Sequence, residues 1–206
     1  MIGIYGGFFT PTEAAGIGAG TALVIALAMG GLTWNKLFTA GVDCARTTAM
    51  IFTIIIGAEV FSNFVSYAGL PDAILEWVLD LEVNAYVVML VLVLIYVVLG
   101  AVLESLSMIL LTVPIFYPMV TSLDFGTGLL SDPDAVTIWF GIIVVVVTEI
   151  SLISPPIGLN VFVLRSVLPD VSLRTMFAGI IPFWVADLFR LALLIAVPSL
   201  SLMLIL

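Results

Sequence analysis

The chain has 206 residues, 63% of them apolar and 9% charged, and a formal net charge of −9. Soluble domains are about half apolar and about a quarter charged, so this composition is typical of a membrane protein. The sequence has no histidine and one cysteine, which excludes Ser-His and Cys-His catalytic pairs, an internal disulfide bond and a Cys/His zinc site. It also lacks the GxxxxGK(S/T) motif of ATP-hydrolysing pumps.

Apolar runs of about 18 residues or more, the length that a bilayer core requires, recur along the chain. They are continuous and do not alternate with polar residues, which favours helices over strands. We therefore expect an all-α polytopic protein of a bacterial or archaeal cytoplasmic (inner) membrane. It would contact the lipid bilayer, bind no nucleic acid and have no enzymatic activity.

The first predicted helix covers about 11–30. Thr10 can cap its start, Pro11 suits the first helical position, and Glu13 stands where a capping box places its acid. Helix initiation explains these three residues, so we assign them no binding role.

Three more elements complete residues 1–83, which we interpret as a region of scaffold-type helices. Mixed polar and apolar residues predict an interfacial helix at about 34–45, and a continuous apolar run predicts a membrane span at about 47–68. After a Gly-Leu-Pro break, the acidic, amphipathic stretch at about 71–82 predicts a second surface helix.

Residues 84–206 are interpreted as a transport-type region that begins with a hairpin at about 84–121. Only the short stretch "ESLS" at 104–107 separates its two apolar segments. This pattern predicts either two membrane crossings joined by a tight turn or a re-entrant helical hairpin. A broken helix at about 136–167 and a final span at about 173–197 follow.

The distribution of charge predicts the orientation of these elements. Basic residues gather at 33–46 and 165–174, whereas acidic residues gather at 71–82 and 124–134. By the positive-inside rule the two basic segments are cytoplasmic. The predicted hairpin must then enter and leave the membrane from the outer side.

The broken helix is interrupted by "SPPIGLN", residues 154–160. Irregular backbone at membrane depth persists only where it is packed in protein or lines a cavity. Pro155 and Pro156 force the helix open, and Gly158 permits the unusual dihedrals of the gap. The freed carbonyl and N–H ends suit a cation and an anion respectively, and Ser154 and Asn160 add side-chain oxygens.

The hairpin turn offers a matching set of oxygens from Glu104, Ser105 and Ser107. Two interrupted helical elements that meet near mid-membrane are typical of the binding site of a secondary transporter. Other acids receive structural interpretations: Glu59 as a packing or interfacial group, Glu149 as an intramembrane acid that is protonated or bonded to neighbouring backbone, and Asp187 as the partner of Arg190 three residues along the last helix.

Four blocks carry a resemblance to a known family: "GIYGGFFTPTEAAGIGA", "LESLSMILLTVPIFYPMV", "WFGIIVVVVTEISLISPPIGLNVFV" and "IIPFW". In order and spacing they resemble the large permease subunit of TRAP (tripartite ATP-independent periplasmic) transporters. The resemblance implies an elevator-type secondary transporter built from two inverted repeats, each with a re-entrant hairpin and a discontinuous helix. It further implies Na⁺ as coupling ion, a small TRAP membrane subunit, and a periplasmic substrate-binding protein that delivers an organic acid.

Carried over residue by residue, the resemblance implies a binding site with members at both interruptions: Glu104, Ser105, Ser107, Ser154, Pro155, Gly158 and Asn160. For Na⁺ itself it implies Ser107, Ser154 and Gly158. Two positions depart from the family pattern, since Glu104 stands where Asp is usual and Ser154 where Thr is usual. Both changes retain an oxygen ligand.

The chain resembles only the second half of the family's permease. We therefore expect the C-terminal half of such a permease, from a split, truncated or mis-started gene, with the N-terminal half as a missing partner. One alternative is half of a stand-alone dicarboxylate or citrate-type sodium symporter of the same superfamily. Another is a non-catalytic structural membrane subunit.

Overall fold

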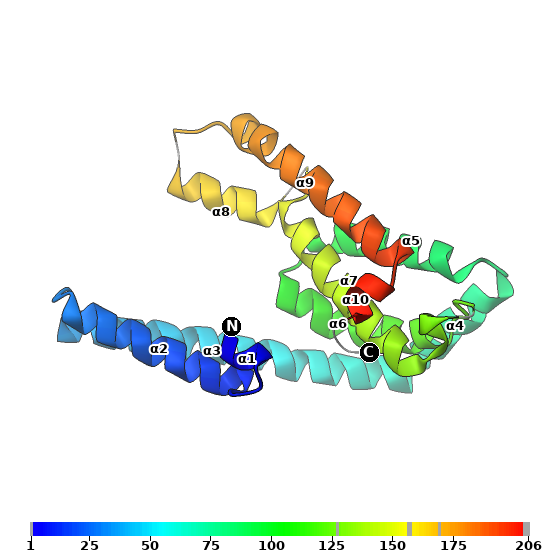
Figure 1. Ribbon diagram of the computed structural model, residues 1–206, viewed down its shortest axis with the longest axis horizontal. Coiled ribbons are helices and arrows are strands. Elements are labelled where there is room, and N and C mark those ends of the chain that lie inside the picture. Colours follow the sequence, from blue (N-terminus) through cyan, green and yellow to red (C-terminus); the bar gives the residue numbers. More distant parts are fainter. Residues whose placement is uncertain (1, 127, 156–157, 169, 204–206) are drawn as a thin grey trace. The chain divides into compact units, whose positions relative to one another are not determined.

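The computed structural model describes residues 2–126, 128–155, 158–168 and 170–203 (Figure 1). Regular structure in these ranges is helical throughout, which confirms the all-α prediction. The chain divides into two compact units, one ending at Thr53 and the other beginning at Ile54. Among the described residues, four helices are long and apolar enough to span a membrane, as expected of a polytopic protein: α2 (Pro11–Ala28), α3 (Trp34–Tyr67), α7 (Pro133–Ile153) and α9 (Leu173–Ala196).

The first unit contains α1 (Ile2–Tyr5), α2 and the first part of α3. The predicted capping box of α2 is confirmed, because the Thr10 hydroxyl accepts a hydrogen bond from the Glu13 N–H at 3.3 Å. In return, the Glu13 carboxylate accepts the Thr10 N–H at 2.8 Å. The two residues thus satisfy N–H groups that the first helical turn leaves unpaired.

Helix α3 differs from the sequence prediction. Separate elements are expected at 34–45 and 47–68, but the structure has one continuous helix of 34 residues. The junction around Arg46 contains neither glycine nor proline, so extending the helix is less costly there than opening its hydrogen-bond ladder. The change from mixed to apolar residues marks a change of environment along one helix.

The second unit is built around α7, which lies at its centre and packs against α5, α6, α9 and α10 (Figure 1). The following helices of the unit lie close to their predicted positions: α4 (Leu70–Asp80), α5 (Ala85–Gly100), α6 (Ser105–Thr121) and α8 (Leu159–Val167). Two short helices, η1 (Leu129–Ser131) and α10 (Ser199–Leu202), occur among the described residues without having been predicted.

The core of this unit is organised around Trp139 of α7, which is fully buried. Its ring meets Phe125 edge-on at a centroid distance of 5.2 Å and Tyr86 of α5 at 6.5 Å. The Trp139 indole N–H also donates to the Leu194 carbonyl of α9 at 2.9 Å. That carbonyl lies four residues before Pro198, which has no N–H to offer it.

We expect Trp139→Phe to destabilise the fold by about 1–3 kcal/mol, because it keeps an aromatic ring but removes the donor that satisfies a partly buried carbonyl. Thermal unfolding of the purified protein measures the effect. Trp77→Phe is the control, since Trp77 is 64% exposed and its replacement should leave the unfolding temperature unchanged. Equal behaviour of the two variants would contradict the role given to the Trp139 N–H.

Candidate functional site

The predicted hairpin consists of α5 and α6, joined by the four residues 101–104. The helices are antiparallel: the hydroxyls of Tyr96 and Thr112 are hydrogen-bonded at 2.7 Å, and Met108 packs beside Gly100 nearer the turn. At 16 and 17 residues, each helix is about 25 Å long. Both are shorter than the hydrocarbon core of a bilayer, about 30 Å.

Glu104 is the N-cap of α6, and its carboxylate folds back over the first turn of that helix. One carboxylate oxygen accepts the Leu106 N–H and the Ser105 hydroxyl, each at 3.1 Å. The other accepts the Ser107 N–H at 3.1 Å and the Ser107 hydroxyl at 3.2 Å. The structure therefore gathers the three predicted turn residues into one cluster, in which the hydroxyl hydrogens point at the carboxylate and the hydroxyl lone pairs remain available.

The predicted break is present: α7 ends at Ile153 and α8 begins at Leu159. Ser154, only 2% exposed, leaves helical geometry with ψ at 130°. Its hydroxyl donates to the Ile150 carbonyl and accepts the indole N–H of Trp184 from α9, both at 2.8 Å. One lone pair of the Ser154 oxygen is left for a further ligand.

Gly158 is the N-cap of α8 and has a φ of +55°, a conformation that side chains other than glycine rarely adopt. It is buried, and a Cβ there would lie 3.4 Å from the Ile153 carbonyl group. Pro155 and Asn160, by contrast, are exposed, whereas the neighbouring Ser154 and Gly158 are buried. Pro156 lies outside the described residues.

A contact between α5 and α7 places the turn and the break at the same end of the unit. The two helices run in the same direction, since Tyr86 lies near Trp139 and Gly100 lies against Ser151. The approach of Gly100 is so close that a Cβ at this position would overlap the Ser151 side chain. Ser151 is fully buried and donates to the Thr148 carbonyl at 2.6 Å. The break begins three residues after Ser151, at Ser154.

Sequence reasoning missed Gly100 and Trp184 as parts of this site. The contact of Gly100 joins residues 51 positions apart, and the bond of Trp184 to Ser154 spans 30 positions. For the Gly100 contact the sequence offers only a weak signal, a glycine at the end of an apolar segment. No local pattern points to the bond between Trp184 and Ser154.

The resulting site contains oxygen ligands and helix ends. The end of α7 presents carbonyl groups with partial negative charge, and the start of α8 presents N–H groups with partial positive charge. In the described part of the chain, no group of three or more His, Cys, Asp or Glu side chains could hold a metal ion. Hydroxyl and backbone oxygens with one carboxylate are ligands that suit a hard cation.

Three other charged residues singled out in the sequence lie within α7 and α9. Asp187 and Arg190 form an ion pair on α9 at 3.1 Å, as their spacing predicts. Glu149 is exposed on α7, directed away from the buried side of that helix.

Comparison with known proteins gives consistent results. The family model described as "Tripartite ATP-independent periplasmic transporter, DctM component" matches residues 1–200. The chain is 30% identical over 207 residues to the sialic acid TRAP transporter large permease protein SiaM of Vibrio cholerae, covering 98% of the chain and 45% of that protein. It is 32% identical over 201 residues to the C4-dicarboxylate TRAP transporter large permease protein DctM of Pseudomonas aeruginosa, covering 97% and 44% respectively.

A third relative is the isethionate TRAP transporter permease protein DctMQ of Oleidesulfovibrio alaskensis. The chain is 32% identical to it over 166 residues, which is 80% of the chain and 25% of that protein. The chain therefore spans less than half the length of the curated relatives it matches.

Proposed function

This chain belongs to the family of the DctM component of tripartite ATP-independent periplasmic transporters, and we propose that it contributes one cation-binding half of a sodium-coupled permease for an organic acid. The proposal is supported chiefly by one observation, that the Gly100–Ser151 contact holds the hairpin turn and the helix break at the same end of the second unit. In this proposal Na⁺ lies between the Ser107 and Ser154 hydroxyls and the backbone at Gly158.

We propose a re-entrant arrangement for the hairpin. Helices α5 and α6 are each shorter than a bilayer crossing needs. Both pack along α7, and the Gly100–Ser151 contact puts their turn at the end of α7 where the break begins. Glu104 adds negative charge next to the cation without occupying its place, because the four donors around it hold the carboxylate on the turn. An elevator movement of this region would carry the cation and the substrate across the membrane together.

The remaining partners follow from the same family membership. We propose that the transporter also requires the other half of the permease and a small membrane subunit, both in a bacterial inner membrane, and a binding protein in the periplasm. The relatives are named for sialic acid, C4-dicarboxylates and isethionate, so we propose a small organic anion as substrate. Family membership favours this tripartite system over a stand-alone symporter, and a permease role over enzymatic catalysis.

Uptake into proteoliposomes that hold the complete transporter tests the proposal. Labelled sialic acid, a C4-dicarboxylate and isethionate are supplied with the binding protein, in NaCl or in choline chloride. We expect uptake of one of them to require Na⁺, and Ser107→Ala and Ser154→Ala each to raise the Na⁺ concentration for half-maximal uptake at least tenfold, because each removes an oxygen ligand. Ser66→Ala, at an exposed position on α3, is the control. Unchanged Na⁺ dependence in both site variants would contradict the assignment.

A further inference from the structure

The second unit contains carboxylates for which the chain provides few countercharges. No Lys or Arg occurs between Arg46 and Arg165, whereas Glu59, Glu104 and Glu149 all lie within that stretch among apolar residues. A charged side chain in the hydrocarbon region costs several kcal/mol unless it is paired, protonated or bound to a cation. Glu104 is held by the four donors at the hairpin turn.

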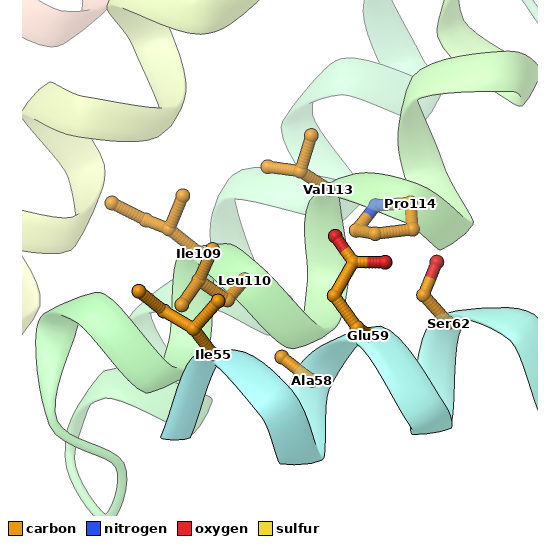
Figure 2. Close-up of a pocket in the computed structure, with 8 residues that line it drawn as sticks. All are labelled: Ile55, Ala58, Glu59, Ser62, Ile109, Leu110, Val113 and Pro114. Carbon is orange, nitrogen blue, oxygen red and sulfur yellow. The ribbon is translucent and has the colours of Figure 1, made fainter. Parts of the chain in front are cut away.

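Glu59 is exposed on α3 and lies at the rim of a cavity between α3 and α6. The segments of both helices that line this cavity belong to the second unit. Figure 2 shows the oxygens of Glu59 and Ser62 pointing from α3 toward α6. The cavity has a volume of about 200 Å³ and is otherwise lined by apolar groups, from Ile55, Ala58, Ile109, Leu110, Val113 and Pro114. A water molecule occupies about 30 Å³ in the liquid, so the cavity has room for an ion and several waters.

Among the described residues, three that line this cavity offer an oxygen without a hydrogen-bond partner. Within the described ranges the side chains of Glu59 and Ser62 form no hydrogen bond or ion pair, so their oxygens remain available. The third oxygen belongs to the Leu110 carbonyl, which would normally receive the N–H four residues along the helix. That position is Pro114, which has no N–H. Leu110 and Pro114 both line the cavity, so the face of α6 opposite the Glu59 carboxylate and the Ser62 hydroxyl carries a carbonyl without its helical donor.

We propose that this cavity binds a monovalent metal cation, held by the Glu59 carboxylate, the Ser62 hydroxyl and the Leu110 carbonyl with water as the remaining ligand. A single carboxylate balances one positive charge, whereas divalent cations are usually held by several carboxylates. The bound cation would neutralise Glu59 within the membrane and tie α3 to α6. This site shares no ligand with the Na⁺ site proposed between the hairpin turn and the helix break, and does not depend on it.

Thermal unfolding of the purified full chain tests the inference with NaCl and KCl as probes and choline chloride as the control for ionic strength. The measurements are made in a Ser107→Ala/Ser154→Ala background, so that failure of the turn-and-break site is distinguished from failure of this one. We expect a saturable rise in unfolding temperature in NaCl, KCl or both, and the relative response to the two salts identifies the preferred cation.

Glu59→Gln should abolish this rise, and Ser62→Ala should raise the salt concentration at its midpoint at least threefold. Glu149→Gln, which removes an exposed acid on α7, is the matched control and should retain the full response. If Glu59→Gln does not fold, Glu59→Asp replaces it, and its shorter side chain should shift the midpoint upward.

Two outcomes would overturn the inference. One is a salt response that is the same with and without the Glu59 carboxylate. The other is that Glu59→Gln changes only the pH dependence of the unfolding temperature and leaves its salt dependence intact. Glu59 would then bind a proton and no metal ion.

Discussion

Gly100→Ala is expected to separate the hairpin turn from the helix break and to abolish the Na⁺-dependent stabilisation that this site provides, measured in a Glu59→Gln background so that the cavity beside Glu59 does not contribute. A Cβ at position 100 would overlap both the hydroxyl and the Cβ of Ser151. Rotation of the hydroxyl relieves only part of this clash, so α5 and α7 must move apart. Overpacking of this kind costs about 1–3 kcal/mol. Ligands on the two sides of the contact would also lose their common position, which thermal unfolding in NaCl and in choline chloride measures.

The effect should be reversed by a second change on the opposite helix. Ser151→Gly removes the atoms that the new methyl group would meet, so Gly100→Ala/Ser151→Gly is expected to recover most of the Na⁺ response. Gly141→Ala is the control on α7: a Cβ there has open space, and alanine favours a helix over glycine by about 0.5–1 kcal/mol. Failure of the double variant to recover, with the control intact, would contradict the role of the contact.

The elements of this fold were largely predictable because their signals are local. Thr10 and Glu13 lie three residues apart and form the predicted capping box, and the Asp187–Arg190 pair also spans three residues. The break after Ile153 follows from adjacent prolines that cannot continue a helix. In each case the residues that decide the structure are neighbours in sequence.

The exception among the elements is α3, where a local signal was misinterpreted. The charge of Arg46 and the polar residues before it indicate a change of environment, but a change of environment does not require a change of backbone. Only glycine, proline or a side chain that competes for backbone hydrogen bonds gives a physical reason to end a helix. Neither glycine nor proline stands at the predicted junction, and Thr47 and Thr48 beside it do not interrupt the helix.

The candidate site was only half predictable. The cluster of Glu104, Ser105 and Ser107 is a property of one helix start and could be anticipated from the sequence. The positions of this cluster and Ser154 are set by contacts between distant segments, of which Gly100 against Ser151 is the tightest. Such contacts depend on which helix faces pack together, and one sequence carries no local signal for that. The binding of an ion by these residues stays a prediction.

Gly158→Val is expected to disrupt the break itself, by a route independent of the contact at Gly100. With φ at +55°, position 158 lies in the left-handed region, where a residue other than glycine is disfavoured by about 1–2 kcal/mol and a β-branched one is an outlier. The added Cβ would also lie 3.1 Å from a methyl group of Val161 and 3.4 Å from the Ile153 carbonyl. Together these effects should cost about 3 kcal/mol, or about a hundredfold in Na⁺ affinity if the cost falls on the bound state.

Gly30→Val separates backbone strain from crowding. Gly30 has a similar φ of +68°, but a Cβ there meets nothing within 4 Å, so its replacement should lower the unfolding temperature while the Na⁺ response stays at the wild-type level. Measured in the Glu59→Gln background, Gly158→Val should lose the Na⁺ response, because its valine forces the Ile153 carbonyl and the start of α8 away from the positions they share around Ser154. If the two variants lowered the unfolding temperature equally and both kept the Na⁺ response, strain alone would account for Gly158. The close approach of the two half-helices would then have no part in binding the ion.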